Sequence, residues 1–315
     1  MCRHLLILLI FFSTLYANEP IQPLPKTITY DKGKALLGKK LYFDPILSKD
    51  NTVSCASCHN LELGGVDNLQ FSIGIKGQKG IINTPTVLNS IFNFRQMWDG
   101  RAKTLTHQVK FPITNPKEMG NSFENIIKTL NKSTYYNKTF KALYKNGITK
   151  ENIGDALEEF QKTLITPSSF DDFLRGDEKA ITENQKKGYE LFNKKGCVSC
   201  HNGINIGGGL YAQFGLTDES IANNLINQST KNGYNPDFGL YNITKNDFDK
   251  FYFKVPTLRN VALTYPYLHN GRIKTLNEAI SSIAKAQLGL DLSKEETFLI
   301  EEFLKSLSGK VTIIR

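Results

Sequence analysis

Apolar residues recur at helical spacing along several stretches of the chain, whereas the strict alternation expected of a strand is scarce. Polar residues suited to cap a helix precede several of these stretches. The helices predicted in this way cover residues 123–130, 153–164, 182–192, 276–286 and 294–307. The pattern therefore predicts a mainly α fold.

The first residues differ from the rest of the chain. Arg3 and His4 precede an apolar run over residues 5–12, and small residues follow it up to Ala17. A basic start, a short apolar run and a small-residue exit are typical of a signal peptide. The run is too short for a membrane span, which needs roughly 20 apolar residues. We expect cleavage near Ala17 and a periplasmic mature chain without a membrane span.

A mature chain of about 300 residues exceeds what one hydrophobic core usually organises, so two domains are expected. Pro, Ser and Gly are enriched over residues 165–177, which we take as the domain junction. The predicted division is a signal peptide at 1–17, an N-terminal domain at 18–170 and a C-terminal domain at 171–315. The net charge is +9, but the lysines are spread without a basic block. A solvated surface explains them better than nucleic-acid binding does.

Four of the five cysteines form two pairs, each followed directly by a histidine; they are Cys55, Cys58 and His59, then Cys197, Cys200 and His201. Disulfides or a zinc site could use such cysteines, but neither explains the histidines. The pairs also lie about 140 residues apart, far beyond the roughly 15–20 residues of a zinc ribbon. Cys-x-x-Cys-His attaches c-type heme through two thioethers and supplies the proximal ligand of the iron. The sequence predicts two covalently bound hemes.

The two motifs have similar surroundings, which form an internal repeat. Gly38 and Leu41-Tyr42-Phe43 precede the first motif, while Gly188 and Glu190-Leu191-Phe192 precede the second. Gly64-Gly65 follows the first motif, and Gly207-Gly208-Gly209 follows the second. We therefore expect two cytochrome c-like domains, each built around one heme.

Two further stretches carry a family resemblance. The run Phe92-Asn93-Phe94-Arg95-Gln96-Met97-Trp98-Asp99-Gly100-Arg101-Ala102 comes before Asn115-Pro116-Lys117-Glu118-Met119-Gly120. The other stretch is Val255-Pro256-Thr257-Leu258-Arg259-Asn260-Val261, with Thr264-Tyr265-Pro266-Tyr267-Leu268-His269-Asn270-Gly271. Both resemble bacterial di-heme cytochrome c peroxidases, whose relatives include the maturation enzyme of tryptophan tryptophylquinone.

The resemblance implies a role for each matching position. The heme at His59 would react with peroxide, and the heme at His201 would take electrons from a small cytochrome c or cupredoxin. Glu118 matches the distal acid/base, Gln108 its companion and Trp98 the aromatic residue between the hemes. Such a carboxylate can carry a proton between the peroxide oxygens. Without the motif, we would take Glu118 for a surface acid and Trp98 for a core aromatic.

The resemblance also implies a calcium site and a homodimer. Asn83 and the backbone carbonyls of Thr264 and Pro266 match the calcium ligands. Spacing alone does not establish the calcium site, because two of its ligands are backbone carbonyls.

The sequence departs from the family at two positions. A histidine that often ligates the resting peroxidatic iron, sixteen residues after the first heme histidine, is replaced by Ile75. We therefore expect the first heme to need no reductive activation. A methionine that usually ligates the second iron is replaced by Ile283. Losing it should lower the potential of the second heme unless another ligand compensates.

His269, Lys285 or no protein ligand at all are the alternatives at the second iron. His269 falls in a family motif and suits a role in organising the region between the hemes. His107 suits an exposed helix face beside Gln108.

Three functions are compatible with these residues. The first is reduction of hydrogen peroxide with electrons from a periplasmic cytochrome c. The second is a di-heme electron-transfer or redox-sensing protein with weak or no turnover, which the missing methionine favours. The third is oxidation of a protein or organic substrate. Glu118, Gln108 and Trp98 favour the first, because an electron carrier needs no distal acid.

Overall fold

The computed structural model describes residues 19–215, 217 and 237–315, and it confirms the mainly α prediction. The predicted signal peptide at 1–17 lies outside these residues. The described helices are α1 (Lys32–Phe43), α2 (Cys55–Cys58), α3 (Leu105–Gln108), α4 (Lys110–Thr114), α5 (Phe123–Lys132), α6 (Thr134–Leu143), α7 (Lys150–Lys162), α8 (Ser169–Leu174), α9 (Glu183–Lys194), α11 (Tyr241–Thr244), α12 (Leu276–Leu288) and α13 (Lys294–Ser306). None of the described helices is long and apolar enough to cross a membrane.

A helix occupies each stretch in which helical spacing was found, and polar caps set where these helices begin. Thr182 caps α9 and forms a capping box with Gln185, as Ser293 does with Glu296 at the start of α13. Such pairs satisfy backbone N–H groups that have no partner inside the helix. The pattern did not identify α6, which follows α5 after a single residue, Ser133.

The buried apolar residues form two hydrophobic cores, each with one close helix pair. In the first core α1 crosses α7, and in the second α9 crosses α13. A Cβ on Gly38 would lie 1.8 Å from the carbonyl oxygen of Ala156, and one on Gly188 would lie 2.0 Å from that of Leu299. These glycines occupy equivalent places in the internal repeat. The repeat therefore encodes the same close helix crossing twice.

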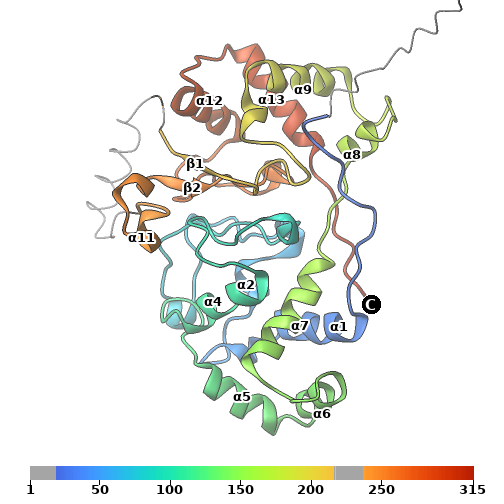
Figure 1. Ribbon diagram of the computed structural model, residues 1–315, viewed down its shortest axis with the longest axis vertical. Helices are drawn as coiled ribbons and strands as arrows, with labels where there is room; N and C mark the ends of the chain where they lie inside the picture. The colour runs from blue at the N-terminus through green and yellow to red at the C-terminus, as the bar shows by residue number, and fades with distance from the viewer. Residues whose placement is uncertain (1–18, 216, 218–236) are drawn as a thin grey trace, which may run out of the picture.

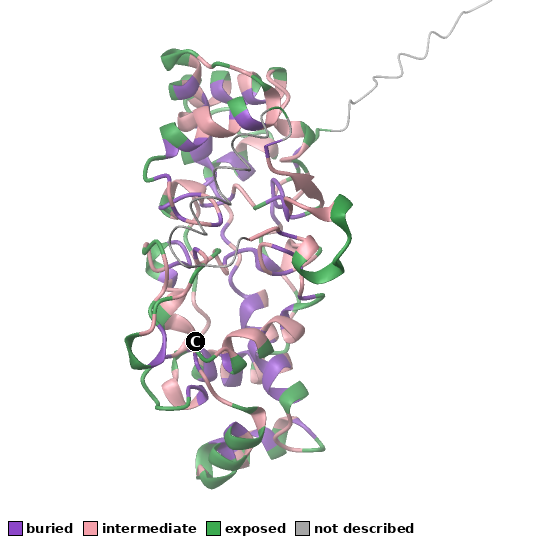
Figure 2. Cartoon of the chain, turned by 90° about the vertical axis from the view of Figure 1, so that its left-hand side faces the viewer, coloured by how far each residue is buried: buried purple, intermediate pink, exposed green. Residues whose placement is uncertain are grey.

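The first and last segments that the structure describes each cross from one core to the other. Ile21 is fully buried in the second core, although the first core begins only at Leu37. After α13 the C-terminal segment returns to the first core, where Ile314 accepts a hydrogen bond from Lys39 Nζ at 2.8 Å (Figure 1). Buried residues are found in both halves of the elongated molecule (Figure 2). The boundary at 170/171 remains a prediction, as does the cytochrome c-like character of each half.

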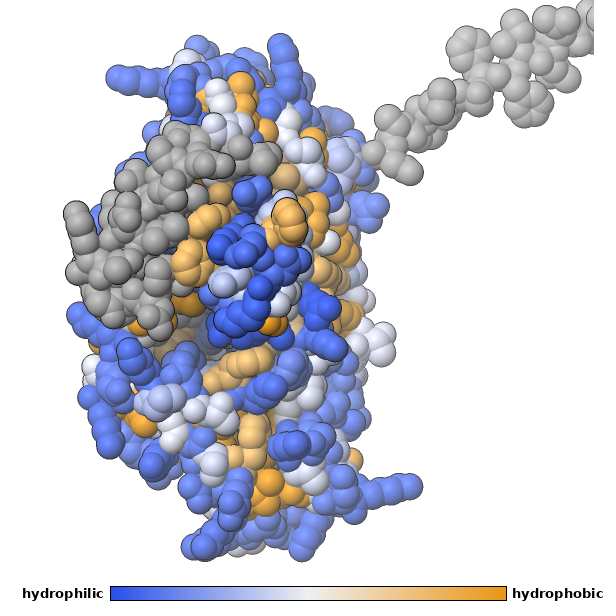
Figure 3. All heavy atoms as spheres, turned by 60° about the vertical axis from the view of Figure 1, so that its left-hand side comes forward, coloured by the Kyte–Doolittle hydropathy of each residue, from blue (hydrophilic) through white to orange (hydrophobic). Residues whose placement is uncertain are grey.

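A small antiparallel sheet lies between the two groups of helices (Figure 1). Its strands are β1 (Tyr211–Gln213) and β2 (Tyr252–Lys254), with Tyr211 opposite Lys254. The N–H of Lys254 donates to the carbonyl of Trp98 at 2.9 Å, which fixes the sheet against the other half. The hydrophobic pattern did not predict these strands, because three-residue strands are too short to show alternation. Hydrophobic residues gather on the surface near this middle zone, among a largely hydrophilic exterior (Figure 3).

Candidate functional site: two heme-attachment motifs

The first attachment motif forms the single turn α2. Ser54 and Ser57 form a capping box that holds the turn at its start. The next residue, His59, has its Nδ1 atom 3.2 Å from the carbonyl oxygen of Gly65. This contact makes Nδ1 the protonated nitrogen and leaves Nε2 free to bind a metal.

The second motif repeats this geometry around a short 3₁₀ turn, Cys197–Ser199. His201 Nδ1 lies 3.3 Å from the carbonyl oxygen of Ile206. Burial lowers the pKa of His201 to about 4, so the imidazole is the neutral form that a metal requires. Gly207 follows with φ of 122°, and a Cβ there would lie 2.2 Å from the carbonyl oxygen of Pro256. Only glycine permits this close approach beside the histidine ring.

The four cysteines of the motifs are free, and no disulfide joins them. Burial raises the pKa of Cys55 to about 12 and that of Cys197 to about 11. Such surroundings disfavour a thiolate but accept the uncharged sulfur of a thioether. In the described part of the chain, no cluster of three or more His, Cys, Asp or Glu side chains could hold a metal ion. These observations favour heme attachment over the disulfide and zinc alternatives.

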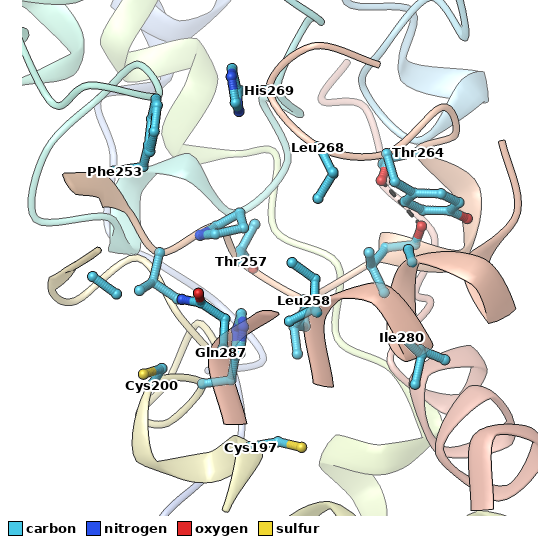
Figure 4. Close-up of a pocket in the computed structure, with 18 of the residues that line it drawn as sticks. Cys197, Cys200, Phe253, Thr257, Leu258, Thr264, Leu268, His269, Ile280 and Gln287 are labelled. Atoms are coloured by element: carbon cyan, nitrogen blue, oxygen red, sulfur yellow. Dashed lines mark hydrogen bonds between the residues drawn. The ribbon is translucent and has the colours of Figure 1, made fainter. Parts of the chain in front are cut away.

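A cavity of about 300 Å³ opens beside the second motif. Cys197 and Cys200 lie at one end of it, and Phe253 and His269 lie at the other (Figure 4). Its walls are mainly apolar and come from several elements, including Phe192, Phe214, Leu258, Leu276, Ala279, Ile280, Ile283, Leu288, Ile300 and Leu304. An apolar cavity that contains two thiols and an imidazole fits a covalently attached porphyrin.

The structure argues against one of the three alternatives for the second iron. Ile283, on α12, lines the cavity where the family has methionine. Lys285 is directed elsewhere: its side chain is 49% exposed and its amine pairs with Asp291 at 2.5 Å. His269 is buried in the cavity wall and stacked on Phe253, with 4.6 Å between ring centroids. Lys285 is therefore a poor candidate for the ligand.

Ile283→Met is expected to restore methionine ligation and raise the potential of the second heme. The equilibrium constant for reduction of this heme by a fixed donor should rise by at least about tenfold, equivalent to about 59 mV. Spectroelectrochemical titration measures this shift. Ile280→Met is the matched control, because Ile280 lines the same cavity from the preceding turn of α12. If the second heme had the same potential in Ile283→Met as in Ile280→Met, the prediction would be contradicted.

Trp98 lies where the two halves meet. Its Nε1–H donates to the carbonyl of Asn83 at 2.9 Å, and its ring packs edge-on to His269 at 6.3 Å. The amide nitrogen of Asn83 donates to the carbonyls of Leu69 and Gln70, which leaves the Oδ1 atom for another partner. Asn83, Thr264 and Pro266 all line the cavity. The three residues with a predicted calcium role thus border the same cavity.

Glu118 is half-buried in the tight turn that follows α4. Its Oε1 accepts a hydrogen bond from the Asn115 amide at 2.7 Å. Burial raises the pKa of Glu118, while this hydrogen bond and the charge of Arg101 oppose the rise. Burial raises the pKa of the Cys58 thiol, and the charges of Asp67 and Glu118 add to the rise. Glu118 therefore lies within electrostatic range of the first attachment motif. The family resemblance assigned no role to Asn115, its hydrogen-bond partner.

The segment containing Ile75 is fixed against the same turn. The N–H of Ile75 donates to the carbonyl of Glu118 at 2.8 Å. A Cβ on Gly74 would lie 2.0 Å from the carbonyl oxygen of Lys117, and a Cβ on Gly120 would lie 2.3 Å from Ile75 Cδ1. Ile75 itself is 4% exposed. Its side chain thus stabilises the turn that presents Glu118.

Gln108 and His107 lie on the short helix α3. The Gln108 amide approaches the sulfur of Met97 at 3.8 Å, which places Gln108 next to the Trp98 segment rather than hydrogen-bonded to Glu118. His107 accepts the N–H of Lys103 through Nδ1 at 3.1 Å and packs against Phe111. These two contacts lie within the same segment, residues 103–111.

Comparison with known proteins identifies the family of this chain. Residues 32–179 match the family model described as di-haem cytochrome c peroxidase. The chain is 44% identical to cytochrome c551 peroxidase of Nitrosomonas europaea over 295 residues, covering 93% of this chain and 85% of that protein.

Cytochrome c peroxidase Ccp of Escherichia coli is 46% identical over 299 residues, 94% of this chain. This chain spans only 63% of the length of the E. coli protein. A solved MauG-like protein associated with microbial copper homeostasis superposes with a TM-score of 0.76 at 27% identity, covering 94% of this chain and 95% of that one. The chain therefore belongs to the di-haem cytochrome c peroxidases, a family of enzymes.

Proposed function

We propose that this protein reduces hydrogen peroxide to water in the periplasm, using electrons from a small c-type cytochrome or a cupredoxin. The observation that carries the proposal is Glu118, a half-buried carboxylate whose pKa is raised by burial and whose charge acts on the Cys58 thiol of the first attachment motif. An electron carrier needs no such acid. The peroxidases of N. europaea and E. coli support the same activity.

Two attached hemes, held by Cys55, Cys58 and His59 and by Cys197, Cys200 and His201, would supply electron transfer and the site of peroxide reduction. Peroxide reduction consumes two electrons and two protons and releases two water molecules. Glu118 takes a proton from one peroxide oxygen and delivers it to the departing oxygen. The hydrogen bond from Asn115 orients the carboxylate for this transfer.

Electrons would enter through the heme of the second motif and pass by Trp98 to the first. Trp98 suits this position because its ring packs against His269 in the cavity wall, while its backbone is anchored to β2. Calcium held by Asn83 Oδ1 and the carbonyls of Thr264 and Pro266 would join these same segments. A homodimer, as the resemblance implies, belongs to the proposal as well.

The purified holoprotein is expected to turn over peroxide without prior reduction, because Ile75 supplies no ligand that must first leave. The ratio of initial rates with and without pre-reduction should be close to one. Stopped-flow measurement with a reduced small cytochrome c gives this ratio. An oxidised protein that stays inactive until reduced, with a low-spin first heme, would contradict the expectation.

The second candidate is a di-heme electron-transfer or redox-sensing protein. Ile283 in the cavity wall favours it, because loss of methionine lowers the driving force for reducing the second heme. The rate experiment separates the two functions. A fully heme-loaded protein that never turns over peroxide, with or without pre-reduction, would replace the peroxidase proposal by this one.

A further inference from the structure

One lysine is buried where the two halves meet. Lys254 ends β2 and is 7% exposed, whereas the sequence had suggested solvated lysines. Its backbone is held on two sides, by pairing with Tyr211 across the sheet and by the hydrogen bond to Trp98. The lysine therefore has a fixed position rather than a flexible surface one.

No salt bridge joins Lys254 to a carboxylate of the residues that the structure describes. Lys254 lines the cavity beside the second motif, and no other Lys and no Asp, Glu or Arg of the described residues lines it. Burial lowers the pKa of its amine to about 8. A buried ammonium group without an anion is costly, because it loses hydration and gains nothing in return.

Heme attachment would bring an anion, a propionate carboxylate, into the same cavity. Cys197, Cys200 and His201 line it together with Lys254, and a heme attached there carries two propionate carboxylates. We propose that Lys254 binds a propionate of the second heme, at the edge of the cavity nearest Trp98. The proposal requires heme at the second motif and is independent of peroxide turnover.

This contact has a consequence for electron transfer. A cation beside a heme propionate stabilises the reduced heme, because reduction removes one positive charge from the iron. The effect is strong where water is excluded, as it is around the buried lysine. Lys254 would thus offset part of the potential that the second heme loses when isoleucine replaces methionine.

The test compares Lys254→Met and Lys254→Arg with wild type as heme-loaded full-length proteins. Heme content is measured first, and the potential of each heme is then obtained by spectroelectrochemical titration. In Lys254→Met the equilibrium constant for reducing the second heme should fall by at least about tenfold, or about 59 mV. Lys254→Arg should remain within threefold of wild type, and the first heme should be unchanged in both.

Lys285→Met is the matched control, because Lys285 belongs to α12 but lies outside the cavity, paired with Asp291. Its second heme should keep the wild-type potential. A fully loaded Lys254→Met protein with an unchanged potential would overturn the proposal. Loss of the low-spin spectrum of the second heme in Lys254→Met would also overturn it, because the amine would then be an iron ligand.

Should Lys254→Met fail to incorporate heme, wild type and Lys254→Arg are compared by redox-difference infrared spectroscopy. A propionate carboxylate band that shifts between the two proteins supports the contact. A band at the same frequency in both refutes it. None of these readouts requires turnover, so they remain decisive for a protein that proves not to be a peroxidase.

Discussion

Glu118→Gln is expected to lower peroxide turnover by roughly 10²–10⁴-fold, the usual contribution of a general acid/base. Glutamine keeps the size of the side chain and still packs beside Asn115, but it cannot accept and return a proton. Steady-state oxidation of a reduced small cytochrome c by peroxide, at matched heme content, measures the loss. Because the substitution affects proton transfer and not the heme surroundings of the electron-transfer path, the potentials of both hemes should stay at their wild-type values.

The pH profile adds an independent readout. Burial raises the pKa of Glu118 above the ordinary value for glutamate. The carboxylate that acts as base is therefore lost as pH falls through this raised pKa, and wild-type turnover should fall with it. Glu118→Gln should lack this acidic limb. Glu124→Gln, at an exposed site in the first turn of α5, is the control and should behave as wild type. Undiminished turnover in Glu118→Gln would remove Glu118 from the mechanism.

Local patterns were sufficient to predict much of the fold. Helical spacing and capping residues act within a few positions along the chain, so α5, α7, α9, α12 and α13 were recognisable from short windows. The internal repeat also has a packing role that the sequence pattern did not reveal. Gly38 and Gly188 looked like part of a recurring motif, and the structure gives the reason: each lets one helix cross another at backbone contact.

Contacts between distant segments were not predictable in this way. A three-residue strand such as β2 has no recognisable period, so nothing in the sequence distinguished Lys254 from the solvated lysines. The crossing of the first and last described segments between the cores was missed for the same reason, because it depends on pairings such as that of Ile21 with Gly203. The site residues came from a family resemblance, which assigns positions but not the contacts of Asn115 or Lys254.

One of these distant contacts leads to the largest expected effect on stability. Arg259 and Asp171 form an ion pair at 3.0 Å in which both side chains are 0% exposed. Arg259 also donates to the carbonyls of Ile204 and Gln22, at 2.7 and 3.1 Å. Asp171 in turn accepts the N–H of Leu24 at 2.6 Å. The pair therefore joins the N-terminal segment, the loop after the second attachment motif and helix α8.

Arg259→Met is expected to lower the free energy of unfolding by about 3–5 kcal/mol, because it leaves the Asp171 carboxylate buried without its countercharge. Denaturant unfolding followed by heme absorbance and tryptophan fluorescence measures the loss. Adding Asp171→Asn should recover part of the loss, since the remaining group is uncharged. Lys250→Met, which breaks the exposed pair with Asp247, should cost at most about 1 kcal/mol. If Arg259→Met lowered the free energy of unfolding no more than Lys250→Met does, the buried pair would contribute specificity of packing rather than stability. The Arg259→Met/Asp171→Asn double variant would then be as stable as either single variant.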